Sequence, residues 1–217
     1  MSIKGHNEFK DSPDNHDFMT EEHIAGFLRN HKTGIDNVGR HTLAQIVAQH
    51  NNPRVVDAAC GTCVNWDVFK RVGVECQYVG VDRTKGMLAE ASKRYGDEIT
   101  LQEGYVQDLP LDDGEADIVI MRHIVEHLQD GYEAAVREGL RVASKELVLV
   151  FFLDPSEAEE DVISESEPDD NGCTYFWNTY SWPKFTEFVA TLGVQVKVGH
   201  VVTPGAAHAD TIVRLIK

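Results

Sequence analysis

Residues 54–66 constrain what this chain can fold into more than any other stretch. They read R-V-V-D-A-A-C-G-T-C-V-N-W, with the β-branched pair Val55 and Val56, then small residues, then a helical pattern over 64–72. This order predicts a strand at 54–59, a tight turn and a helix. In an open α/β sheet such a junction leaves free backbone N–H groups at a helix N-terminus, where an anionic ligand group can bind.

A second predicted strand, 77–82, ends in an acidic residue. Asp82 lies 21 positions after Gly61, close to the spacing of about 20 residues at which a carboxylate binds ribose hydroxyls. Because neighbouring parallel strands end at the same edge of a sheet, we expect Gly61 and Asp82 to lie together. The pattern predicts a site for a cofactor that contains a nucleoside.

Strands and helices alternate through the rest of the chain, which predicts an α/β fold with a mostly parallel sheet. The apolar run at 146–153 is typical of a strand buried on both faces. Pro204-Gly205 between the last two strands predicts an antiparallel hairpin at one edge. The remaining helices are expected at 84–95, 123–129, 132–143 and 182–192, and the remaining strands at 100–106, 117–121, 146–153, 194–203 and 210–217.

The length of 217 residues fits one domain with additions. We expect residues 1–50 to form a loose arm and two helices, as a lid or cap on the α/β domain at 51–217. An acidic insert at 154–172 is expected to be a solvated loop, with a mobile cover near the substrate as the alternative. The aromatic cluster that follows is expected to be core, with a substrate platform as the alternative; it comprises Tyr175, Phe176, Trp177, Tyr180 and Trp182.

Composition narrows the classes of partner. Twenty basic against 36 acidic side chains give a net charge of −16, which argues against a nucleic-acid partner. No apolar run approaches the roughly 20 residues of a membrane span, and the first residues lack an apolar signal core, so we expect a cytoplasmic protein without a membrane partner. We expect the four cysteines, Cys60, Cys63, Cys76 and Cys173, to be reduced.

Three stretches together resemble the class I S-adenosylmethionine (SAM)-dependent methyltransferases. They are V-V-D-A-A-C-G-T-C, Y-V-G-V-D-R-T and L-P-L-D-D-G-E-A-D-I-V-I-M-R-H-I-V-E-H-L. The resemblance covers roughly residues 50–153 and is closest to the small-molecule branch that includes the ubiquinone-biosynthesis methyltransferases. It implies a three-layer Rossmann-like fold with a seven-stranded, mostly parallel sheet, SAM as the cofactor, no metal, and methyl transfer to a small-molecule acceptor.

The resemblance also implies roles for residues near the strand ends. His123 would face the acceptor as a candidate catalytic base. The implied cofactor contacts are Asp57, Ala59, Cys60 and Gly61 at the methionine end, Asp82 at the ribose, Arg83, Met87, Val106 and Gln107 at the adenine, and Met121 and Arg122 beside the sulfonium.

The chain departs from the family pattern at three positions. Ala59 and Cys63 stand where the family usually has glycine, and Tyr105 stands where an acidic residue often lies near the adenine amino group. These changes motivate an alternative function, a non-catalytic module of the same fold that binds a protein partner through the acidic insert or the aromatic cluster.

Other motifs point to competing chemistries. Residues 123–127 match H-x-x-E-H, an inverted zinc-peptidase pattern, although we expect Glu126 and His127 to pack and cap. Cys60 and Cys63 form a C-x-x-C pair of the kind found in thioredoxin-like proteins. A nicotinamide dehydrogenase would share Asp82, but the G-x-G-x-x-G turn is missing. DNA amino-methyltransferases usually carry an Asp/Asn-Pro-Pro-aromatic run where residues 121–124 read M-R-H-I.

Overall fold

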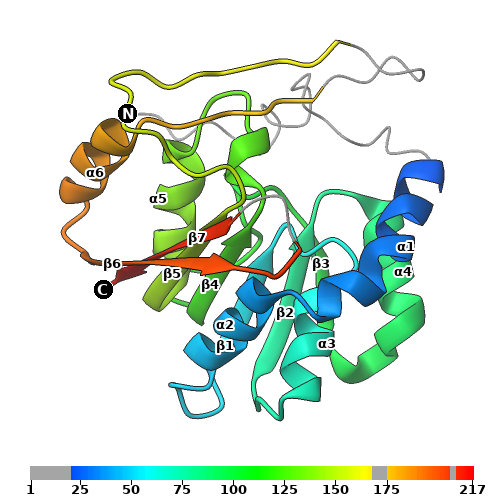
Figure 1. Ribbon diagram of the computed structural model, residues 1–217. Coiled ribbons are helices and arrows are strands. Elements are labelled where there is room, and N and C mark those ends of the chain that lie inside the picture. Colours follow the sequence, from blue (N-terminus) through cyan, green and yellow to red (C-terminus); the bar gives the residue numbers. More distant parts are fainter. Residues whose placement is uncertain (1–20, 168–174, 206–208) are drawn as a thin grey trace.

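The computed structural model describes residues 21–167, 175–205 and 209–217. Within these residues seven strands form one sheet in the order β3-β2-β1-β4-β5-β7-β6 (Figure 1). The strands are β1 (Arg54–Ala58), β2 (Gln77–Asp82), β3 (Thr100–Glu103), β4 (Ala116–Arg122), β5 (Ala143–Phe151), β6 (Gln195–Val202) and β7 (Ala209–Ile216).

Strand direction confirms the expected fold class. The five strands from β3 to β5 are parallel to their neighbours. Strand β7 inserts between β5 and β6 and is antiparallel to both, so β6 and β7 form the expected C-terminal hairpin at one edge. All the parallel strands therefore end at the same edge of the sheet, where α/β proteins bind their ligands.

Helices cover both faces of this sheet and make three layers (Figure 1). Alternate residues of the central strands enter two separate cores, as the period of two in a strand requires. The helices are α1 (Glu21–Ile35), α2 (Val38–Val47), α3 (Val64–Arg71), α4 (Lys85–Tyr95), α5 (Glu133–Val142) and α6 (Trp182–Ala190). In β1, Val56 packs with the core under α5 and α6, whereas Val55 packs with the core under α2, α3 and α4.

Two strands end two or more residues earlier than the sequence predicts. Strand β3 stops at Glu103 rather than 106, because a turn follows in which the N–H of Asp108 donates to the carbonyl of Tyr105 at 3.0 Å. Strand β5 stops at Phe151 rather than 153, because the N–H of Phe152 donates to the carboxylate of Glu126 instead of to the sheet.

The expected helix at 123–129 is also shorter. It is reduced to one 3-10 turn, η3 (Val125–His127). His123 has a φ of +54°, a left-handed conformation that no helix continues through.

The acidic insert is more ordered than a free solvated loop. Its residues 156, 162 and 165 form isolated bridges with Ser181, Thr179 and Phe176. Residues 154–167 and 175–181 thus form an extended arm at the edge of the sheet where the parallel strands end (Figure 1). The arm at 1–20 and residues 168–174, which include Cys173, lie outside the described residues.

Candidate functional site

The turn after β1 and the tip of β2 are joined by hydrogen bonds. The N–H of Gly61 donates to Oδ2 of Asp82 at 2.8 Å, and the N–H of Thr84 donates to Oδ1 at 2.8 Å. Behind them, the N–H groups of Ala59 and Cys60 both donate to the carbonyl of Val81. The two features that the sequence predicts to meet therefore lie together.

The backbone of this turn is left-handed at three residues. The φ values are +64° at Ala59, +53° at Gly61 and +57° at Cys63. The left-handed conformation costs a residue with a Cβ about 1–2 kcal/mol and costs glycine almost nothing. The departures from glycine at Ala59 and Cys63 thus keep the turn's shape and add local strain.

The side chain of Cys63 stays out of the space beside the turn, because the glycine at position 80 of β2 leaves room for its sulfur in the core. A Cβ at Gly80 would lie 2.9 Å from Sγ of Cys60 and 3.0 Å from Sγ of Cys63. The hydrogen bond with Cys63 and burial raise the pKa of Cys60 well above its ordinary value. Both thiols are free and buried, and a protonated thiol is a poor redox nucleophile, which argues against the thioredoxin-like interpretation.

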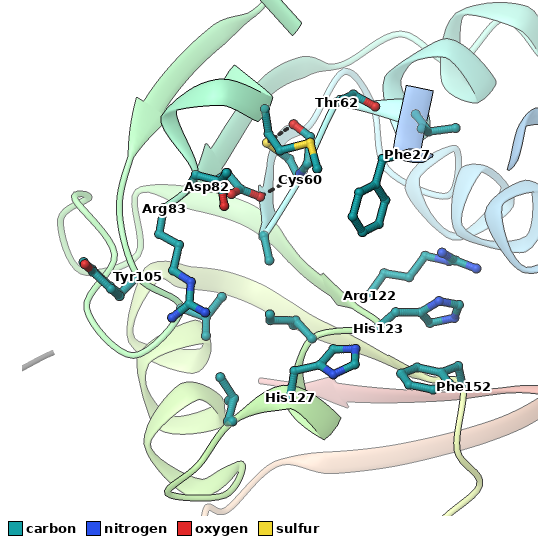
Figure 2. Close-up of a pocket in the computed structure, with 18 of the residues that line it drawn as sticks. Phe27, Cys60, Thr62, Asp82, Arg83, Tyr105, Arg122, His123, His127 and Phe152 are labelled. Carbon is teal, nitrogen blue, oxygen red and sulfur yellow. Dashed lines mark hydrogen bonds between the residues drawn. The ribbon is translucent and has the colours of Figure 1, made fainter. Parts of the chain in front are cut away.

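A cavity of about 760 Å³ opens beside this turn, where the parallel strands end (Figure 2). It has the size of a ligand pocket for a small molecule or cofactor. Most of the residues singled out in the sequence line it: Ala59, Cys60, Gly61, Asp82, Arg83, Met87, Val106, Gln107, Arg122 and His123.

Two predicted contacts, Asp57 and Met121, point into the cores instead. The carboxylate of Asp57 lies on the α3 face, where Asn65 donates to it at 3.0 Å and the hydroxyl of Tyr78 also donates. Burial raises the pKa of Asp57 to about 6. Met121 lies on the opposite face, with its Cε 2.9 Å from the position of a Cβ on Gly139. Both residues lie within their strands, ahead of the strand ends that border the cavity.

The N-terminal helices supply cavity residues that the sequence did not single out. Phe27 of α1 and Arg40 of α2 both line it. Nη1 of Arg40 donates to the carbonyl of Gly34 at 3.3 Å, while its buried Nε has no partner among the described residues. Burial and the nearby charge of Arg122 lower the pKa of Arg40 to about 9. Its position is set by the packing of α2, which no local sequence signal reveals.

A buried polar group lies at the other end of the cavity. Asp210, from β7, accepts from Nη2 of Arg122 at 3.2 Å and from Nε2 of His123 at 2.8 Å. Burial alone would raise the pKa of Asp210, but its bond with His123 and the charge of Arg122 hold it below the ordinary value. Burial lowers the pKa of His123 to about 4. His123 is therefore neutral near pH 7, with its proton on Nε2 and its lone pair on Nδ1.

The H-x-x-E-H stretch does not form a zinc site of the peptidase kind. Oε1 of Glu126 accepts from the N–H of Phe152 at 2.7 Å, and burial raises the pKa of Glu126 to about 7. Nδ1 of His127 donates to the carbonyl of Phe176 at 2.8 Å. Within the described part of the chain, no group of three or more His, Cys, Asp or Glu side chains is arranged to hold a metal ion.

Residues 56–151 match the family model described as a methyltransferase domain. This range holds the left-handed turn, Asp82 and His123. Over residues 56–151 the chain is therefore similar to methyltransferase domains. The seven-stranded sheet and the cavity at the ends of its parallel strands agree with this similarity.

One curated relative is ajmaline N-methyltransferase of Rauvolfia serpentina, which is 29% identical over 115 residues. The match covers 48% of this chain and 38% of that enzyme, so the chain matches well under half the length of the relative.

Solved structures agree with the fold. The 1,6-didemethyltoxoflavin-N1-methyltransferase of Burkholderia thailandensis has a TM-score of 0.65 at 14% identity, over 100% of this chain and 92% of that chain. The magnesium protoporphyrin IX methyltransferase of Synechocystis PCC 6803 with bound SAM has a TM-score of 0.63 at 14% identity, over 97% and 94% of the two chains. Within the described residues, every helix is too short or too polar to traverse a bilayer.

The residues of this site fit SAM, the cofactor bound in the Synechocystis structure. A carboxylate has roughly four acceptor positions, and the N–H groups of Gly61 and Thr84 use two of those on Asp82. The Thr84 side chain also hydrogen-bonds this carboxylate, and the remaining capacity is left for the ribose. At the far side of the turn, the orphaned Nε of Arg40 is an unsatisfied donor on a buried cationic side chain, which suits the carboxylate at the methionine end.

Proposed function

We propose that this protein transfers a methyl group from SAM to a small-molecule acceptor bound in the same cavity. One observation carries the proposal: a single cavity joins the Gly61–Asp82 pair at one end to Arg122 and His123 at the other. A cofactor at the first end would direct its reactive group toward the second. In this proposal the acceptor lies against His123, at the end of the cavity away from Asp82.

The proposed cofactor contacts follow the cavity wall. Asp82 accepts hydrogen bonds from the ribose hydroxyls, and Arg40 pairs with the methionine carboxylate. Asp57 and Met121 act from the cores behind these contacts and support the turn and strand β4. The adenine lies against Arg83, Met87, Val106 and Gln107, and the sulfonium lies near Arg122.

Methyl transfer from SAM requires the protein mainly to align the nucleophile with the methyl group. SAM, when bound, supplies a methyl group that its sulfonium already makes electrophilic. The cavity residues hold the nucleophile in line and exclude water, effects that reach about 7–11 kcal/mol in favourable systems. An oxygen acceptor also requires a base, and we assign this role to Nδ1 of His123, with the carboxylate of Asp210 stabilising the imidazolium that forms. A thiol or amine acceptor needs no such base.

The acceptor class and the branch are part of this proposal. The names of these proteins refer to small molecules: ajmaline, 1,6-didemethyltoxoflavin and magnesium protoporphyrin IX. The net charge of −16 supports an acceptor other than nucleic acid. We also place the protein in the small-molecule branch with the ubiquinone-biosynthesis methyltransferases, on the three sequence stretches. We place it in the cytoplasm because the first residues lack an apolar signal core and no apolar run is long enough to span a membrane.

Incubation with SAM and a pool of small metabolites tests the proposal. We expect S-adenosylhomocysteine to accumulate above the level given by SAM alone, together with a product whose mass is one methyl group higher than its precursor. Tight SAM binding without turnover in any pool would instead support a non-catalytic module, and absence of SAM binding would overturn both.

A further inference from the structure

One wall of the acceptor end of the cavity is made of packed aromatic rings. The ring of His127 stacks on Phe152 with centroids 5.4 Å apart and meets Trp177 edge to face at 5.1 Å. Phe152 and Trp177 also meet edge to face, at 5.8 Å. The three rings contact one another and form a continuous aromatic surface. The aromatic cluster at 175–182 is therefore divided: Phe176 and Tyr180 are buried, whereas Trp177 lines the cavity.

A second apolar surface lies across the cavity from this wall. Figure 2 shows Phe27 extending into the cavity from α1, opposite His127 and Phe152. Phe27 is 52% exposed and Trp177 is 47% exposed, although both line the same cavity. Large apolar side chains left open on two sides of a pocket are typical of a ligand-binding surface. A flat ring between them would cover both.

The aromatic wall offers one defined polar atom. Because Nδ1 of His127 donates to the carbonyl of Phe176 at 2.8 Å, the ring's proton is on Nδ1 in the neutral form. Burial lowers the pKa of His127, which keeps the ring neutral near pH 7. The lone pair on Nε2 then has no partner among the described residues. It can accept a hydrogen bond but cannot donate one.

Charge at this end disfavours a cationic ligand. Arg122 is a cation on the cavity wall, and both oxygens of Asp210 already accept, one from Arg122 and one from His123. Among the described residues that line the cavity, Asp82 at the cofactor end is the one carboxylate, so none at the acceptor end pairs with an ammonium group. A sulfonium beside Arg122 would add a further positive charge. An uncharged ligand avoids this repulsion.

We propose that the acceptor is a flat, uncharged aromatic molecule that lies between Phe27 and the wall of Phe152 and Trp177, with a ring N–H or phenolic O–H donated to Nε2 of His127. This inference rests on the proposed function and specifies the substrate class of the same cavity. His127 acts here as a group that orients the acceptor by a hydrogen bond.

Calorimetric titration of the protein saturated with S-adenosylhomocysteine tests the proposal without turnover. The probes are two matched sets: indole, 1-methylindole and octahydroindole; and 2-naphthol, 2-methoxynaphthalene and decahydro-2-naphthol. We expect the first member of each set to bind more tightly than its capped and its saturated counterparts, by about tenfold, which corresponds to about 1.4 kcal/mol. Decahydro-2-naphthol is uncharged, as 2-naphthol is, so this pair tests the effect of flatness with no change of charge.

Variants connect the binding to these side chains. Trp177→Ala should lower the affinity for the aromatic probes by about tenfold, and Trp177→Phe should lower it much less. His127→Phe should remove the preference for the uncapped probe over the capped one. Val162→Ala is the control, because Val162 is 53% exposed on the same arm and does not line the cavity.

Equal binding of aromatic and saturated probes, or unchanged binding in Trp177→Ala, would overturn the inference. Failure of S-adenosylhomocysteine to bind in the same samples would instead overturn the proposed function.

Discussion

The N–H of Gly61 donates a 2.8 Å hydrogen bond to Oδ2 of Asp82, which joins the turn after β1 to the tip of β2. The N–H of Thr84 holds the other carboxylate oxygen at the same distance. The carboxylate is thus fixed before any ligand arrives. Burial raises the pKa of Asp82, whereas the two N–H donors favour its ionised form. A fixed acceptor pair of this kind loses little entropy when a diol binds.

Substitution of Ala59 by glycine should stabilise the protein. Ala59 has a φ of +64°, and relief of a left-handed alanine, about 1–2 kcal/mol, exceeds the extra unfolded-state entropy of glycine, about 0.4–1 kcal/mol. We expect Ala59→Gly to raise the free energy of unfolding by roughly 0.5–1 kcal/mol in urea titrations. Ala58→Gly, in the ordinary conformation of β1, is the control and should be destabilising. A loss of stability in Ala59→Gly would show that the turn is not strained.

Removal of the Arg40 guanidinium should lower the affinity only for ligands that carry the methionine carboxylate. We expect Arg40→Met to lower the affinity for S-adenosylhomocysteine by about tenfold, the loss expected when one charge-assisted hydrogen bond is removed. Methylthioadenosine, which lacks the amino-acid end, should bind to parent and variant alike. Calorimetry with both ligands measures this difference. Arg71→Met is the control, since Arg71 is exposed on α3 and pairs with Asp36. Equal losses for both ligands would contradict the assignment.

The buried Glu126 should make stability depend on pH. Burial raises its pKa from 4.5 to about 7, so between these values the folded protein holds a proton that the unfolded chain has released. The stabilisation is complete below about pH 4.5 and is lost as the pH rises through 7.

Glu126→Gln removes this titration and keeps an oxygen acceptor for the N–H of Phe152. We expect the free energy of unfolding of the parent to fall relative to the variant between pH 5 and 8, by at most on the order of 3 kcal/mol. His123 titrates in both proteins, so its opposite effect cancels in the comparison. Urea titrations at several pH values check this, and a constant difference would place the pKa of Glu126 near its ordinary value.

Much of the fold could be predicted from local pattern. The strand, small-residue turn and helix at 54–71 and the spacing from Gly61 to Asp82 were sufficient to place the cavity, because parallel strands end at a common edge. The strand ends could not be predicted in the same way. Strand β5 stops where Glu126, distant in sequence, captures the N–H of Phe152, and no local signal at Phe152 indicates this.

The candidate site shows the same division. Residues at the ends of strands or just after them, such as Asp82, Arg83 and His123, could be placed from the sequence. Arg40 and Asp210 could not, because α2 and β7 bring them in from distant parts of the chain. Asp57 lies within β1, ahead of the strand's end, and its carboxylate bonds to Asn65 and Tyr78 in the core, so its contact with the cofactor stays a prediction.

SAM titration of three proteins tests the central claim most directly: the parent, Asp82→Ala, and Glu103→Ala as a control for charge at the exposed tip of β3. Circular dichroism first establishes that all three are folded. The account predicts that Asp82→Ala lowers the affinity for SAM by more than about tenfold, the loss expected when charge-assisted hydrogen bonds to a ribose are removed. Glu103→Ala should bind SAM as tightly as the parent does. Equal SAM affinity in the parent and Asp82→Ala would contradict the claim that this carboxylate binds the cofactor.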